Sequence, residues 1–207
     1  AVGETYARVR TLCQELGLSA EYLSFLWGQT AYLNTRAELG AARALGEHLL
    51  AMAQRENDTT KMLMAYRGLG PTLSHQGDLA LAQQYLGQAW ALYDFDEHRS
   101  LIRHFGADPG IVCLSFGMIN LWVLGKADQA LAWSQHAADL AQALEHPFSQ
   151  AFATVFTAWL HVFRREVEAA KAVADRGVAL SAQHNLTQMW AMGKVFQGWA
   201  TAQLGEQ

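Results

Sequence analysis

Several features that mark common classes of protein are scarce or missing in this chain. It contains three prolines in 207 residues, so long helices can run without interruption. Its two cysteines, Cys13 and Cys113, have no neighbouring Cys or His at metal-ligand spacing, and we expect buried, reduced thiols. The longest apolar stretch, Ile111 to Leu124, is too short to span a bilayer. A net charge of −4 without a basic block argues against direct binding of nucleic acid or of a membrane.

Motifs for catalysis are missing as well. The sequence has no GxxxxGK[ST] phosphate loop, no HExxH and no GxSxG, which are the local patterns of common nucleotide-binding and hydrolytic sites. We therefore expect no enzyme and no cofactor. One alternative stays open: Asp94, Asp96 and Glu97, followed by His98, could bind Mg²⁺ or Ca²⁺ in an all-helical, metal-dependent enzyme. The glycine of a calcium loop is missing, however, and a solvated loop between repeats explains the same residues.

What the chain does contain is a repeat. Short turns separate amphipathic segments, and successive turns are 40, 48, 40 and 40 residues apart. A small residue follows each of the first four turns at the same distance. A fixed period in this range is typical of stacked helical arrays, in which each helix pair buries its apolar face against its neighbours. The turn residues are Ala37, Gly77, Gly125, Arg165 and Gly205, and the small residues are Ala42, Ala82, Ala130 and Ala170.

This pattern predicts an all-α fold: a right-handed α-solenoid of about ten helices in antiparallel pairs. We expect one domain over residues 1–207, with a longer connection near 94–108 that holds a short helix around 97–104. The chain starts close to a helix and has no initiating Met, so we expect a piece of a longer protein. The predicted helices cover 4–16, 20–34, 37–55, 60–76, 78–93, 110–124, 127–144, 148–164, 166–183 and 187–204.

One repeat carries the spacing of a known family. Tyr66, Leu69, Gly70, Leu73, Gly77, Leu79, Ala82, Leu86 and Ala89 resemble the tetratricopeptide repeat. Residues 93–153 and 158–170 are similar to the tetratricopeptide region that follows the ATPase module in bacterial signalling proteins of the adenylate-cyclase and maltose-regulator type. The resemblance implies a cytoplasmic, non-catalytic arm that senses a signal or binds a partner for such an ATPase or cyclase.

In the tetratricopeptide architecture the first helix of each pair lines a concave groove. Taken at helical spacing before each turn, the inward positions include four tryptophans, which can stack on an apolar or aromatic ligand. The same tryptophans could instead pack against neighbouring helices. We expect a protein, a peptide or a small apolar ligand in this groove, and a homodimer through exposed repeat ends is a further option. The predicted groove residues are Trp27, Asn34, Arg67, Ser74, His75, Ser115, Trp122, Trp159 and Trp199.

Overall fold

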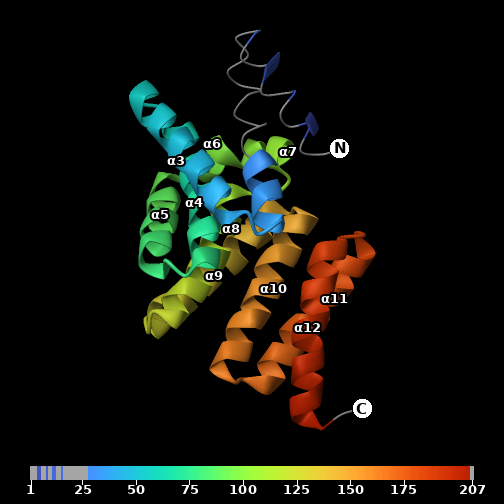
Figure 1. Cartoon of the computed structure of the whole chain (residues 1–207). Coiled ribbons are helices and arrows are strands. Elements are labelled where there is room, and N and C mark those ends of the chain that lie inside the picture. The colour runs from blue at the N-terminus through green and yellow to red at the C-terminus, as the bar shows by residue number, and fades with distance from the viewer. Residues whose placement is uncertain (1–3, 6–7, 9–10, 13–14, 16–27, 206–207) are drawn as a thin grey trace. The chain divides into compact units, whose positions relative to one another are not determined.

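The structure of the protein is a computed structural model, which describes residues 4, 5, 8, 11, 12, 15 and 28–205 (Figure 1). The described residues before 28 are helical. The chain forms two compact units, Ala1–Phe105 and Gly106–Gln207. The expectation of one continuous domain over residues 1–207 stays a prediction.

The first unit contains successive antiparallel helix pairs and then an irregular segment. Residues 28–35 are helical and precede α3 (Leu39–Glu56), α4 (Thr59–Gln76) and α5 (Leu79–Leu92). Helix α4 packs between α3 and α5. The expected longer connection then follows as three short pieces, α6 (Phe95–His98), the 3₁₀ turn η1 (Arg99–Leu101) and α7 (Ile102–Phe105).

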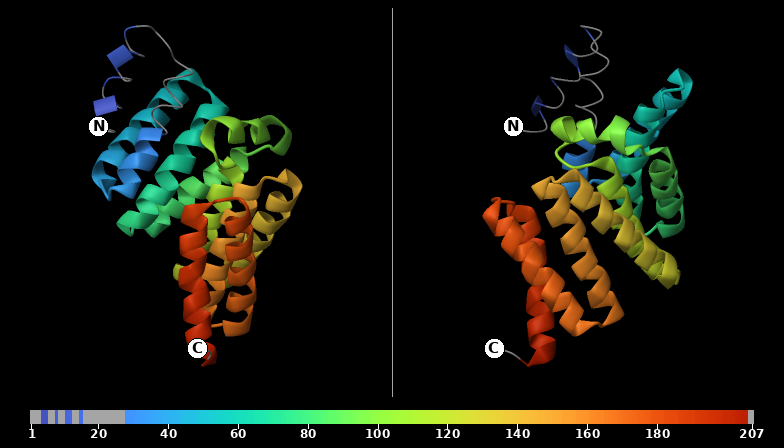
Figure 2. Two further views of the ribbon diagram at one scale, coloured as in Figure 1. Left: turned by 90° about the vertical axis from the view of Figure 1, so that its right-hand side faces the viewer. Right: turned by 180° about the vertical axis from the view of Figure 1, so that it is seen from behind.

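The second unit is a two-layer arrangement of five helices (Figure 2). The first helices of the pairs pack side by side, α10 between α8 and α12, and the second helices α9 and α11 pack against α10. The bounds are α8 (Pro109–Val123), α9 (Ala127–Leu144), α10 (Pro147–Arg164), α11 (Val167–Gln183) and α12 (Thr187–Leu204). From α3 on, the helices of the predicted repeat lie within a few residues of their predicted bounds. The described part of the chain contains no strand, and the all-α prediction is confirmed.

The hairpin turns share one backbone geometry. All five predicted turn residues have a positive φ, from 57° at Arg165 to 84° at Gly77. At the second of these turns the N–H of Gly77 donates to the carbonyl of Ser74, and the N–H of Asp78 donates to that of Leu73. This bonding satisfies carbonyls that the end of a helix leaves without partners. The repeat phase therefore identified each turn correctly, even where the residue is alanine or arginine.

Small residues make the close packing of the pairs possible. The four alanines that follow the turns, Ala42, Ala82, Ala130 and Ala170, are completely buried. On α4, a Cβ added at Gly70 would lie 2.3 Å from Cδ2 of Leu86. The backbone of α4 thus approaches α5 more closely than any residue with a side chain allows.

Side chains of the preceding residues cap several helices. Asp58 accepts a hydrogen bond from the backbone N–H of Lys61 at the start of α4, and Asp108 accepts one from Ile111 at the start of α8. Pro109 takes the first position of α8, where its missing N–H costs nothing. His146 takes the same role for α10, since its Nδ1 accepts from the N–H of Ser149 at 3.3 Å.

Candidate functional site

A row of aromatic rings runs along one face of α10. Neighbouring members are three or four residues apart, so a helix places them above one another. Successive ring centroids lie 5.9, 4.6, 5.6 and 5.7 Å apart, within the range where aromatic pairs attract beyond their burial. We call this set the aromatic row; it consists of Phe148, Phe152, Phe156, Trp159 and Phe163.

The aromatic row continues onto the two neighbouring first helices. Phe116 of α8 lies 5.0 Å from Phe156, and Phe196 of α12 stacks on Trp159 at 5.9 Å with an interplanar angle of 22°. Rings from α8, α10 and α12 therefore meet within one layer of the second unit. The helices are held in place by their own hairpins, so the rings are positioned on rigid elements.

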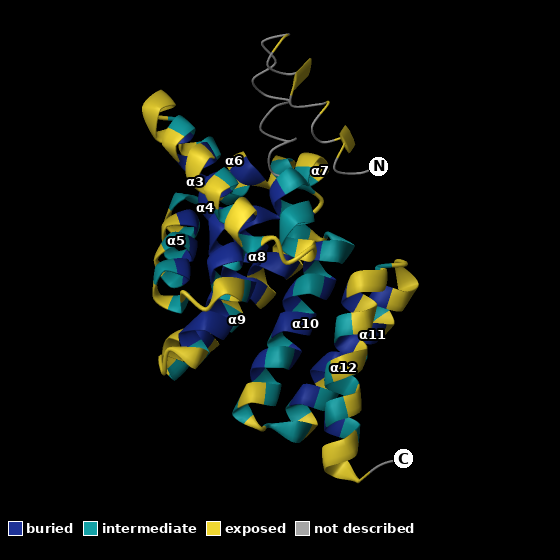
Figure 3. Ribbon diagram, in the orientation of Figure 1, coloured by how far each residue is buried: buried dark blue, intermediate teal, exposed yellow. Residues whose placement is uncertain are grey.

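Exposure divides the aromatic row into a buried centre and accessible ends. Phe156 is 2% exposed, whereas Phe163, two residues before the α10–α11 turn, is 39% exposed. Other large apolar side chains on first helices are also open to solvent, among them Val123 at 54%, Val195 at 66% and Trp190 at 41%. Figure 3 shows buried residues along the middle of α10 and exposed residues at the ends of the hairpins. The first-helix layer thus carries more apolar surface than its own packing covers.

A charged cluster lies at the same end of α10 as Phe163. The guanidinium of Arg164 lies 5.6 Å from the centroid of the Trp122 ring and also binds both carboxylate oxygens of Glu166. Nδ1 of His161 lies 2.7 Å from the same carboxylate. Arg164, and to a lesser degree His161, lower the pKa of Glu166 to about 2. Because the guanidinium is both stacked and bidentate, it fixes the ring of Trp122 against the turn.

The predicted groove residues of the second unit have different surroundings. Trp159 belongs to the aromatic row, Trp122 lies beside Arg164, and Trp199 is half-buried one turn after Phe196 on α12. Ser115 is completely buried in α8, where its hydroxyl has no hydrogen-bond partner among the described residues. The three tryptophans are therefore partly exposed, whereas the serine is completely buried.

The remaining predicted residues lie in the first unit, apart from Trp27, which lies outside the described residues. Asn34 donates a hydrogen bond to Oγ1 of Thr72 at 2.9 Å, which ties the helix of residues 28–35 to α4. Ser74 donates to the carbonyl of Gly70 within its own helix, and Arg67 is 4% exposed. His75 is exposed near the end of α4. Asn34 and Ser74 thus form hydrogen bonds within the unit, and a role of these residues in a groove stays a prediction.

Sequence reasoning missed the phenylalanines that form most of the candidate site. Phe148, Phe152 and Phe156 repeat at every fourth position, and this spacing alone places them on one helical face. The signal was present in the sequence, but only tryptophans were counted as ligand-stacking residues. The candidate site is therefore a continuous row of aromatic rings, whereas the sequence predicted separate tryptophans.

The acidic cluster considered for metal binding has a structural role. The carboxylate of Asp94 accepts a hydrogen bond from the backbone N–H of Glu97 and so caps α6. His98 is 2% exposed and its Nδ1 accepts from the N–H of Asp94. Among the described residues, no group of three His, Cys, Asp or Glu side chains is arranged to hold a metal ion.

The hairpins, their shared turn geometry and the two-layer packing of the second unit define a helical-repeat protein. No protein-family model matches the chain, and no curated protein matches it either. Among solved structures, the chain is similar to the one described as the crystal structure of the apo form of RapI, with a TM-score of 0.62 and 10% sequence identity. The match covers 98% of this chain and 55% of RapI, so the chain spans about half the length of that protein. This likeness supports the helical-repeat fold.

Taken one at a time, the described helices fall short of what a membrane span requires. No single one of them is both long and apolar enough to cross a bilayer, although the bent pair Phe95–Phe105 and Pro109–Val123 reaches the threshold when its parts are taken together.

Proposed function

We propose that this chain is a non-catalytic binding scaffold whose contact surface is the first-helix layer of the second unit. The observation that carries the proposal is the aromatic row, with its buried centre at Phe156 and its exposed end at Phe163. The exposed end of the row leaves apolar surface that packing within the unit does not cover. Partly exposed rings on rigid helices are the kind of anchor that contributes most of the energy at protein interfaces.

The partner that fits this surface is a peptide or protein segment with apolar or aromatic side chains; a small apolar ligand is the alternative. The exposed side chains of this surface include the uncharged Phe163, Val123 and Val195. The positive charge next to Phe163 is Arg164, which is already paired with Glu166. A highly acidic or basic partner would therefore find little compensation for its desolvated charges.

The proposal also includes a setting. The resemblance of residues 93–153 and 158–170 to the repeat region of bacterial signalling ATPases supports a cytoplasmic arm that controls an ATPase or cyclase module. Binding that favours one packing of the helix layers over another would then shift the equilibrium of the attached module. Sequencing the gene on either side of this segment tests the setting, because the absence of a nucleotide-binding module would contradict it.

The binding surface is tested with a displayed peptide library selected on the immobilised chain. We expect selected peptides to be apolar or aromatic, and Phe163→Ser to weaken their binding at least tenfold. The matched control is Leu131→Ser on the second helix α9, because Leu131 is 38% exposed, almost the same as Phe163. Equal losses in the two variants, or a loss only in the control, would place the contact surface elsewhere.

A further inference from the structure

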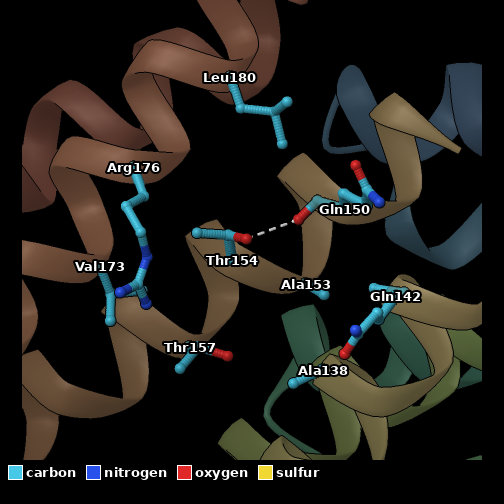
Figure 4. A pocket seen from close by; sticks show the side chains of 10 residues that line it. Ala138, Gln142, Gln150, Ala153, Thr154, Thr157, Val173, Arg176 and Leu180 are labelled. Atoms are coloured by element: carbon cyan, nitrogen blue, oxygen red, sulfur yellow. Dashed lines mark hydrogen bonds between the residues drawn. The ribbon is translucent and has the colours of Figure 1, made fainter. Parts of the chain in front are cut away.

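The second-helix side of the second unit contains a hollow of about 390 Å³. Helices α9 and α11 both pack on α10 but have few contacts with each other, and the hollow lies between them with α10 as its floor (Figure 4). Alanines at Ala138, Ala141 and Ala153 leave the space open. Its size is within the range of small-molecule sites in proteins.

The hollow and the aromatic row use opposite faces of α10. Gln150, Thr154 and Thr157 line the hollow, whereas Phe152, Phe156 and Trp159 belong to the aromatic row. At 100° per residue, Thr154 and Phe152 are separated by about 200°, a little more than half a turn of the helix. The hollow is therefore a different site from the proposed contact surface and does not depend on it.

The lining of the hollow is about half apolar and half polar, and it carries one positive charge. Arg176 extends from α11 toward the end of the hollow at Thr157, as Figure 4 shows. No Asp or Glu lines the hollow, and Arg176 forms no ion pair within the described part of the chain. The carboxylate next to it in sequence, Asp175, is held by Lys171 and Gln197. The guanidinium thus keeps its donors for a bound anion.

The other polar groups add hydrogen-bonding capacity around this charge. Gln142 of α9 and Gln150 of α10 both line the hollow, as Figure 4 shows. Thr154 donates its hydroxyl proton to the carbonyl of Gln150 at 2.7 Å, which leaves the oxygen of the hydroxyl as an acceptor. Each amide can both donate and accept a hydrogen bond. The set suits a ligand that has one anionic end and a neutral polar end.

We propose that this hollow binds a small carboxylate that also carries an amide or hydroxyl group. Arg176 takes the carboxylate, for which its planar fork is geometrically suited. Gln142, Gln150 and Thr154 bind the polar end, and Ala138 lines the hollow on the α9 side, opposite α11.

The test is a ¹H–¹⁵N NMR titration of the full chain with N-acetyl-L-serine. We expect saturable shifts of the amides of α10 and α11 with a dissociation constant at or below about 1 mM. N-acetyl-L-serinamide has the same polar end without the charge and is expected to bind at least tenfold more weakly. Equal binding of the two compounds, or no saturable shift, would overturn the proposal, as would tighter binding of methyl phosphate than of the carboxylate.

Two variants locate the binding site, and two others serve as controls. Arg176→Gln is expected to weaken binding at least tenfold, and Ala138→Leu to abolish it by filling the hollow from an exposed position that leaves the core unchanged. Lys126→Gln removes one exposed positive charge at the other end of α9 and is expected to change the dissociation constant less than twofold. Unchanged binding in either of the first two variants overturns the assignment. Phe163→Ser is expected to leave this binding intact, which separates the result from that of the peptide selection.

Discussion

The close approach of α4 and α5 leads to a prediction about a single methyl group. In Gly70→Ala, the new Cβ would lie 2.3 Å from Cδ2 and 2.5 Å from Cγ of Leu86. Leu86 is completely buried, so displacing it would disturb the packed side chains around it. Overpacking of this kind costs about 1–3 kcal/mol, while replacing glycine by alanine within a helix contributes about 1 kcal/mol in the other direction. We expect a net loss of up to about 2 kcal/mol.

Gly87 provides the matched control, because it lies next to Leu86 on α5 and a Cβ added there would meet nothing within 4 Å. Gly87→Ala is expected to gain the helical term alone and to stabilise by about 1 kcal/mol. The two substitutions are chemically identical and lie in the same hairpin, so their difference isolates the close approach.

Hydrogen exchange of the α4 and α5 amides measures the effect locally, since the two units of the chain need not unfold together. Exchange is expected to be faster in Gly70→Ala and slower in Gly87→Ala than in the original chain. A double-mutant cycle with Leu86→Ala adds a second test: shortening Leu86 should cost less in the Gly70→Ala background. Equal stabilisation by both alanines would refute the reasoning.

Three further predictions concern the ends of α10. Arg165→Gly should raise the melting temperature, because an arginine at φ 57° is strained by about 1 kcal/mol relative to glycine; a lower value would contradict this. Burial lowers the pKa of His146, so the contribution of this residue to stability is complete above pH 6.5 and decreases below it, where the protonated ring no longer accepts a hydrogen bond from the N–H of Ser149. The free energy of unfolding, measured in urea at pH 7.5 and 5.5, should therefore fall with pH. This loss should be smaller in His146→Asn, because asparagine keeps the helix cap and does not titrate. Glu166→Gln should destabilise the protein at pH 7. Because the pKa of Glu166 in the folded chain is about 2, the difference in unfolding free energy between the variant and the original chain should narrow as the pH falls from 4.5 toward 2, by a modest amount at this partly exposed pair. A difference that stays constant with pH would show that the pairing with Arg164 contributes nothing.

The order and length of the helices could be predicted because each hairpin repeats the same local pattern. Ala37 and Arg165 have no preference for a turn of their own, yet both adopt a positive φ. Their positions followed from the distance to the next glycine turn, not from residue type. The segment after α5 was predictable only as an interruption, because residues 94–108 lack the repeat period that fixes helix bounds elsewhere.

The candidate sites depended more on tertiary structure. Helical spacing predicted that Ser115 and the groove tryptophans line the same groove. In the structure Ser115 is completely buried, whereas the tryptophans of the second unit are partly exposed. The pairing of Arg164 with Glu166 could be expected from their proximity in sequence, but its contact with Trp122 required the packing of α8 on α10. The hollow beside Arg176 exists because α9 and α11 stay apart, and no local pattern records that separation.

The left-handed turns have a consequence for the history of this chain. Their conformation is occupied by glycine, alanine and arginine alike, so the bonds of the backbone, and not a particular side chain, hold each corner. Completely buried positions such as Ala82 and Ala130 require only a small side chain. Few positions are then restricted to one residue type. Related proteins of this kind can therefore diverge in sequence until only the similarity of their folds shows their common ancestry.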